Sequence, residues 1–160
     1  MKWIDHQVVT GFVVYTATGD LLLSAYSMVG ALLPDQLEGS PLRGSYWRWR
    51  SRHRGWSHWP MLYLAMLGLL MDRRWDVLSD PRLWSHGSPV VIAAFALIGA
   101  LLHIAEDAVC GKVPVFTPWK KHGLKLFKVG SFAEYFFCIG IVLLCVVVRL
   151  ALSGWWGAPS

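Results

Sequence analysis

Residues 131–156, SFAEYFFCIGIVLLCVVVRLALSGWW, form the most apolar run of the chain. A helix rises ~1.5 Å per residue, so about 20 apolar residues cross a hydrocarbon core of ~30 Å. The run has this length, and Trp155 and Trp156 follow it, where aromatic rings suit the membrane interface. The segment therefore predicts a membrane-spanning helix.

The composition of the whole chain agrees with a membrane location. The chain has 160 residues, is 55% hydrophobic and carries a formal net charge of +5, a combination unusual for a soluble domain. Its positive residues are divided among the loops between apolar segments instead of covering one face, so we expect no nucleic-acid partner. Its ten tryptophans and basic loops suit contact with membrane lipid, which we expect as its partner.

Three further segments are candidates for membrane helices. Residues 88–109 have spanning length and begin with a proline suited to a helix's first turn. Residues 59–71 are apolar but reach only ~20 Å. Residues 7–33 are interrupted by Gly19-Asp20, which allows one long helix or two short helices folded back as a hairpin. Because no internal repeat is present, we expect a single helical domain over residues 1–160.

The charges of the loops predict how the chain is oriented. Residues 34–57 hold arginines at 43, 48, 50, 52 and 54, and residues 110–130 hold lysines at 112, 120, 121, 125 and 128. Residues 72–87 hold acidic and basic residues in equal number. Because positive loops stay in the cytoplasm, the two basic loops are predicted to be cytoplasmic and the C-terminus external.

This topology collects ionisable side chains from three segments at the cytoplasmic end. In HIAED, residues 103–107, the histidine and the aspartate are four apart and share one helix face, where they can meet at one cation. Ionisable groups near the apolar region of a bilayer are costly and usually have functional partners. The candidates for a metal site are Asp35, His53, His58, His103 and Asp107.

The stretch HRGWSHWP, residues 53–60, places two histidines five residues apart, which is too far round a regular helix to face one ion. We expect Ser57 at or near the N-cap of a helix, with Pro60 in its first turn and His53 folded back toward His58. The free N–H groups at this helix start, with the guanidinium of Arg54, would bind a phosphate group.

These motifs occur in an order that is similar to one known family. His6, LLPD at 32–35, HRGWSH at 53–58, HIAED at 103–107 and VPVFTPW at 113–119 resemble the LexA-regulated, bacterial inner-membrane family of metal-dependent hydrolases. The resemblance covers residues 6–119 and implies similarity to zinc-dependent phospholipases C. The chain has Leu37 where the family has a second acidic residue, so either Glu38 substitutes for that ligand or the ligand is absent.

The resemblance implies a larger metal site and a fold that can form it. It implicates His6, Asp35, His53, His58, His103 and Asp107 as metal ligands. For His6 to reach the others, residues 7–33 must turn near Gly19-Asp20. We therefore predict an all-α, polytopic membrane helix bundle with an N-terminal helical hairpin and about three further membrane helices.

The predicted function is a membrane-bound, metal-dependent hydrolase that acts on a phosphoester or ester at the cytoplasmic surface, with a lipid as the expected substrate. Histidine and aspartate ligands suit Zn²⁺ first, and Mn²⁺ or Fe²⁺ next, as one or two ions. Asp35 or Asp107 would be ligand or base, and Arg54 and Ser57 would hold the phosphoryl oxygens. The alternatives are a non-catalytic protein with a structural metal site and an accessory subunit of an envelope assembly.

Overall fold

A computed structural model describes residues 1–39, 53–84 and 87–154, and most of these residues are helical. The longer helices are α1 (Trp3–Thr18), α2 (Leu21–Gly30), α5 (Pro60–Leu78), α6 (Pro89–Cys110) and α7 (Phe132–Leu152). The short elements are α3 (Leu33–Glu38), the 3-10 turns η2 (Trp56–His58) and η3 (Pro81–Leu83), and the strands β1 (Val113–Pro114) and β2 (Lys121–His122). The arginines at 43, 48, 50 and 52 and the tryptophans at 155 and 156 lie outside the described residues.

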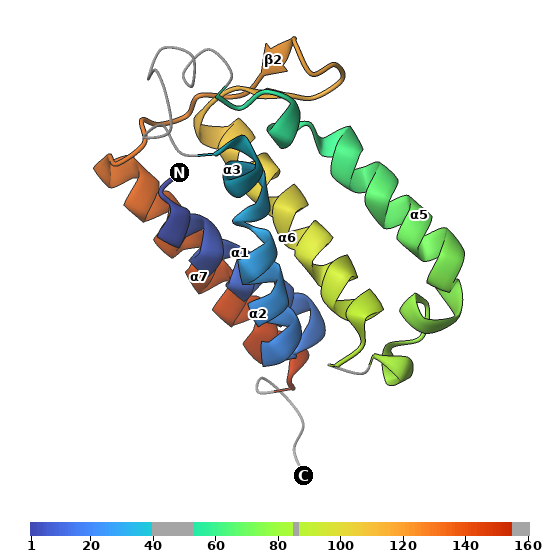
Figure 1. Ribbon diagram of the computed structural model, residues 1–160. Helices are drawn as coiled ribbons and strands as arrows, with labels where there is room; N and C mark the ends of the chain where they lie inside the picture. The colour runs from blue at the N-terminus through green and yellow to red at the C-terminus, as the bar shows by residue number, and fades with distance from the viewer. Residues whose placement is uncertain (40–52, 85–86, 155–160) are drawn as a thin grey trace.

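The predicted N-terminal hairpin is present. Gly19 ends α1 with φ 72°, a left-handed conformation that glycine adopts without steric cost. The Asp20 side chain then caps α2 by accepting hydrogen bonds from the backbone N–H groups of Leu22 and Leu23, at 2.8 and 3.1 Å. Because α2 returns beside α1, the start of α1 and the end of α2 lie at the same end of the molecule (Figure 1).

Small residues let α2 lie closely against α6. A Cβ atom added to Gly30 would fall 2.0 Å from the backbone oxygen of Ala96, and one added to Gly99 would fall 1.9 Å from that of Ser27. Such contacts between backbones are typical of helices that pack through small residues in membranes. The close packing fixes α3, which follows α2, beside the last turns of α6.

Two helices of the described chain are long and apolar enough to cross a membrane. They are α6 and α7, which correspond to the spans predicted at 88–109 and 131–156. The short apolar run at 59–71 lies in a longer helix, α5, which has Pro60 in its first turn as expected and a kink at Arg74. The all-α class is therefore confirmed, whereas the further spans remain predictions.

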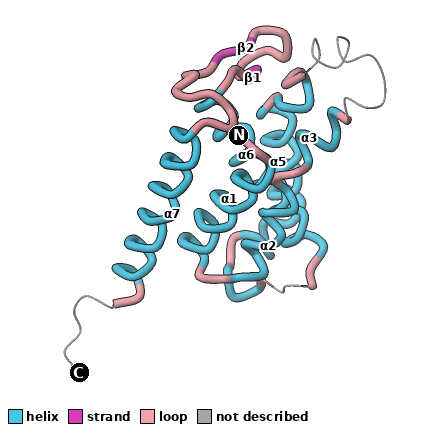
Figure 2. The backbone as a smooth tube through the Cα atoms, turned by 90° about the vertical axis from the view of Figure 1, so that its left-hand side faces the viewer, coloured by secondary structure: helices cyan, strands magenta, loops and turns pink. Residues whose placement is uncertain are grey.

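The segment between α6 and α7 folds over one end of the bundle (Figures 1 and 2). Its strands β1 and β2 are antiparallel and pair Val113 with His122. The backbone N–H groups of Leu124 and Leu126 donate to the carbonyl oxygens of Ala108 and Val109, at 2.8 and 3.0 Å. These bonds satisfy carbonyl groups that the end of α6 would otherwise leave unpaired.

Candidate metal centre

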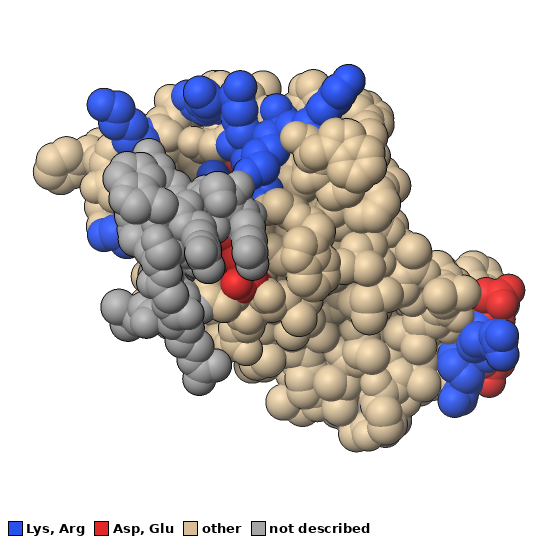
Figure 3. Space-filling model, turned by 45° about the horizontal axis from the view of Figure 1, so that its top comes forward, with Lys and Arg blue, Asp and Glu red and all other residues tan. Residues whose placement is uncertain are grey.

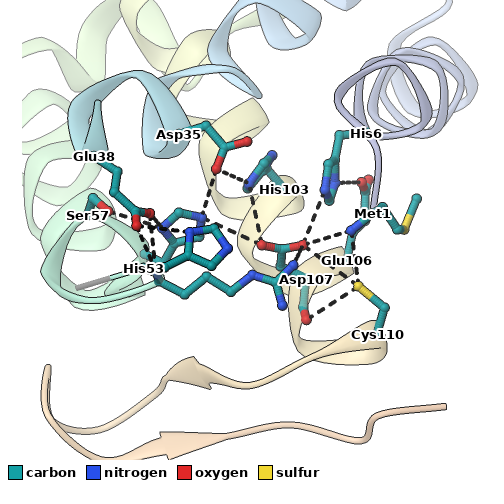
Figure 4. A network of polar contacts seen from close by, with 12 residues as sticks. Met1, His6, Asp35, Glu38, His53, Ser57, His103, Glu106, Asp107 and Cys110 are labelled. Carbon is teal, nitrogen blue, oxygen red and sulfur yellow. Dashed lines mark hydrogen bonds and ion pairs between the residues drawn. The ribbon is translucent and has the colours of Figure 1, made fainter. Parts of the chain in front are cut away.

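The predicted site residues lie at the end of the bundle covered by the β1–β2 hairpin (Figure 4). His6 lies in the first turns of α1, Asp35 in α3 and His58 in η2. His103 and Asp107 lie in the last two turns of α6. Because α1 begins where α6 ends, five side chains from four elements converge there. Four of them are almost fully buried: His6, His58, His103 and Asp107.

His58 and His103 both face the same two carboxylates. The Nε2 atom of His58 lies 3.3 Å from Asp35 Oδ1 and 3.6 Å from Asp107 Oδ2. The Nε2 atom of His103 lies 3.8 Å from Asp35 Oδ1 and 3.7 Å from Asp107 Oδ2. Atoms bound ~2.0–2.1 Å from a tetrahedral zinc ion lie about 3.3–3.4 Å from one another. The observed spacings are therefore close to those of a metal-binding site.

The imidazole nitrogens near these two carboxylates have no hydrogen-bond partners in the described chain. His58 Nε2 and both ring nitrogens of His103 are buried and make no hydrogen bond within the described part of the chain. A buried polar atom without a partner costs free energy, which a bound cation would remove. Asp35, His58 and His103 offer ligand atoms that all lie within 4.8 Å of one another. The donor set thus fits a divalent cation.

His6 forms a second group with His103 and Asp107. Its Nε2 atom lies 3.2 Å from Asp107 Oδ1, and its ring centroid lies 3.9 Å from that of His103. On the other side of the ring, His6 Nδ1 lies 2.6 Å from Glu106 Oε2. Glu106 in turn accepts a hydrogen bond from the Thr10 hydroxyl at 3.2 Å. A carboxylate at the outer nitrogen fixes the orientation of such an imidazole.

The His53 ring does not point toward the place where His58 and His103 face the two carboxylates. Its Nδ1 atom lies 2.9 Å from Glu38 Oε1, and its ring centroid is 6.3 Å from that of His58. Glu38 Oε2 lies 3.4 Å from the Nδ1 atom of His58. Glu38 therefore does not replace the acidic residue that the family has at position 37. It contacts the Nδ1 atom of His58, not the Nε2 atom that faces Asp35 and Asp107, and His53 contacts Glu38 in turn.

Arg54 and Ser57 lie beside the centre with different partners. The Nη2 group of Arg54 donates to Asp107 Oδ1 at 2.7 Å, and its backbone N–H donates to Glu38. Arg54 has φ 55°, which turns the chain so that its side chain reaches the site. The Ser57 hydroxyl lies 3.1 Å from His58 Nδ1. Ser57 thus contacts a histidine of the site directly.

The local helix start differs from the prediction. The N-cap of α5 is Trp59, and Ser57 lies two residues earlier in η2. Its backbone carbonyl accepts a hydrogen bond from the Tyr63 hydroxyl at 2.7 Å, which ties η2 to α5. The reason is that Pro60, at the first helical position, supplies no N–H group for a cap at Ser57.

Asp107 and Asp35 differ in their surroundings. Asp107 is 3% exposed, and its Oδ1 atom contacts Arg54, His6 and the Met1 amino group, the last at 3.1 Å. Asp35 is 35% exposed. Burial alone would raise the pKa of the Asp35 carboxyl, but the nearby imidazoles of His58 and His103 lower it. Asp35 is therefore an ionised group that water can reach.

Glu106 was not predicted as a site residue, although it lies in the HIAED motif. The sequence does contain a signal for Glu106, because two adjacent carboxylates at the end of an apolar helix are costly unless they have partners. His122 lies exposed on β2 and is not among the residues that meet at the centre. His86 falls outside the part of the chain that the structure describes.

Comparison with known proteins yields one family. A family model described as YdjM inner membrane protein matches residues 1–158. Neither the curated proteins nor the solved structures contain a match to the chain. The match supports the inner-membrane family that the sequence motifs resemble, and it gives no support to a similarity with zinc-dependent phospholipases C.

Proposed function

Since the chain belongs to the YdjM inner membrane protein family, we propose that it is a membrane-embedded, metal-dependent hydrolase of phosphoester or ester bonds in lipids. The observation that carries the proposal is the position of His58 and His103 between Asp35 and Asp107, with their inner nitrogens free of hydrogen bonds to the described chain. We place the active site at the cytoplasmic end of a multi-pass bundle.

One divalent ion, Zn²⁺ before Mn²⁺ or Fe²⁺, would be held by His58, His103 and Asp107, with Asp35 beside it as a further ligand or as the base, so that a position remains for water. The two groups of possible ligands share His103. Asp35 and Asp107 both face the Nε2 atom of His103, so we propose a single ion at that atom. In this proposal His6 binds Asp107 and fixes its orientation, and His53 positions Glu38 behind His58.

When bound, the ion would lower the pKa of a water molecule toward ~7 and so supply a hydroxide nucleophile near neutral pH. Asp35 would take up the proton of that water, because it is the more exposed of the two inner carboxylates. Asp107 would remain a ligand, since Arg54 and His6 already occupy its Oδ1 atom. Ser57 would act through His58 and not on the substrate.

Arg54 favours a phosphoester over a neutral ester as the substrate. Its side chain is 15% exposed, and its Nε atom is buried without a hydrogen-bond partner in the described chain. A guanidinium matches the geometry of a phosphoryl group through parallel hydrogen bonds. In this role Arg54 would orient a phosphoryl oxygen beside Asp107 and stabilise the charge that develops there.

The test is hydrolysis by the full-length protein in detergent or nanodiscs. Bis(p-nitrophenyl) phosphate and p-nitrophenyl butyrate are compared after metal removal and after addition of Zn²⁺, Mn²⁺ or Fe²⁺. We expect metal-dependent cleavage of the phosphodiester that falls strongly in Arg54→Gln. Stoichiometric metal without cleavage of either probe would favour the structural metal site, and an absence of bound metal would favour the accessory subunit.

A further inference from the structure

Residues 111–131, called here the basic hairpin, carry an unusual set of exposed side chains. They contain five lysines and no aspartate or glutamate. Between the lysines lie apolar side chains that are more than 60% exposed: Phe116, Trp119, Leu124 and Leu126. A surface that alternates lysines with large exposed apolar side chains differs from an ordinary solvated loop and is typical of an interaction surface.

The second arm of the basic hairpin is attached to the bundle by backbone and side-chain contacts. Besides the backbone bonds from Leu124 and Leu126 to the end of α6, Lys121 Nζ donates to the carbonyl oxygen of His53 at 2.6 Å. A Cβ atom added to Gly123 would fall 1.8 Å from the backbone oxygen of Gly111. The two arms of the hairpin are thus in close backbone contact, and its outer face has a fixed shape.

The position of the basic hairpin relates it to the membrane surface. It connects Cys110, the last residue of α6, to Phe132, the first residue of α7, and these are the two helices long enough to span. Figure 3 shows lysine and arginine side chains gathered over this end, whereas the far end combines both signs of charge. The hairpin therefore lies where two membrane helices would meet one leaflet.

We propose that the basic hairpin docks on the anionic lipid headgroups of the leaflet that surrounds it. The exposed lysines would contact lipid phosphates, and Phe116, Trp119, Leu124 and Leu126 would enter the interfacial region. Each lysine near an anionic surface contributes about a fivefold preference for that surface. Exposed lysines and exposed apolar side chains in one segment match a lipid surface better than a nucleic acid, which offers no apolar layer. The proposal does not depend on hydrolysis or on a metal.

The experiment measures which lipids touch the hairpin of the full-length protein. Phe116→Cys is labelled with an environment-sensitive dye, and the protein is placed in matched nanodiscs containing brominated phosphatidylglycerol or brominated phosphatidylcholine. The native cysteines are buried and should label poorly. We expect strong quenching by the phosphatidylglycerol form, and a preference that falls to near unity in a Lys120→Gln, Lys125→Gln, Lys128→Gln variant or at about 1 M salt.

The matched control carries the dye at Leu83→Cys, an exposed position in η3 at the far end of the molecule. Its quenching should show no dependence on lipid charge, and Arg73→Gln with Arg74→Gln should not change the signal at position 116. Equal quenching at position 116 by both lipids would overturn the proposal. A dye shielded from water but quenched by neither lipid would also overturn it, because a protein partner or a second copy would then cover the hairpin.

Discussion

At the scale of single residues, Asp107 connects the two halves of the centre. Its Oδ1 atom contacts His6 and Arg54, and its Oδ2 atom faces His58 and His103. A carboxylate with both oxygens engaged is held in one orientation, which is what a metal ligand requires. Asp107 is therefore the residue whose loss should disturb the site most.

We predict that His58→Ala and Asp107→Ala each abolish stoichiometric metal binding, because each removes a proposed ligand. Metal content is measured by mass spectrometry on protein purified without chelators, and folding is checked by size exclusion and thermal unfolding. His122→Ala is the matched control, since His122 is exposed on β2. Full metal content in both site variants would refute the assignment.

Glu38 gives a second prediction at this scale. Its carboxylate faces the outer nitrogen of His58 at 3.4 Å and so leaves the inner nitrogen to a ligand. Groups that hold a metal-binding histidine in this way affect metal affinity by about 10–100-fold. Glu38→Gln should weaken metal affinity by this amount in a competition titration, whereas Asp72→Asn, exposed at the far end, should leave it unchanged. An unaltered affinity in Glu38→Gln would show that Glu38 has no such role.

Sequence spacing predicted part of this arrangement and failed at identifiable points. The four-residue spacing of His103 and Asp107 places both on one face of α6, as predicted. The position of His53 depends on how the loop before η2 folds, and the chain turns it toward Glu38. The pairing of His6 with Glu106 depends on the packing of α1 against α6, which no local pattern encodes.

At the scale of elements, the contact between α2 and α6 sets the distance between Asp35 and His103. Gly99 of α6 lies so close to the backbone of Ser27 that any side chain forces the helices apart. Overpacking of this kind costs about 1–3 kcal/mol. Gly99→Ala should therefore lower both the midpoint of thermal unfolding and metal affinity.

Gly140 provides the matched control for this prediction. It lies in α7, and a Cβ atom added there would meet no atom within 4 Å. Gly140→Ala should leave metal affinity and the unfolding midpoint close to those of the unchanged protein. If both substitutions behaved alike, the close approach of α2 and α6 would not be what positions the site.

Elements with strong local signals were predictable from the sequence. Gly19-Asp20 supplies both a left-handed helix end and a helix cap, but these residues alone also allowed one long helix; the hairpin of α1 and α2 was expected because the family resemblance places His6 in the site. Ser57 was expected at or near the N-cap of α5, because serine caps helices better than tryptophan does, and the N-cap observed is Trp59. Tertiary contacts with His58 and Tyr63 use Ser57 instead. No sequence pattern predicted the pairing of β1 with β2, because each strand has only two residues.

At the scale of the whole molecule, the charge distribution predicts the orientation of the bundle. The end with the basic hairpin should be cytoplasmic, and the end with η3 should be external. Lys120→Cys should react with a membrane-impermeant maleimide only in inside-out vesicles, and Ser79→Cys only in right-side-out vesicles. Both positions are exposed. The reverse pattern would place the candidate metal centre on the outer side.

The central claim is that side chains from α3, η2 and α6 share one cation. X-ray absorption at the metal edge of the full-length protein, purified without chelators and with its metal content quantified, tests this most directly. We predict about one ion per chain, with nitrogen and oxygen ligands and the outer-shell scattering typical of imidazole. The imidazole scattering should be weaker in His103→Ala. A protein without stoichiometric metal, or a spectrum that His103→Ala leaves unchanged, would contradict the account.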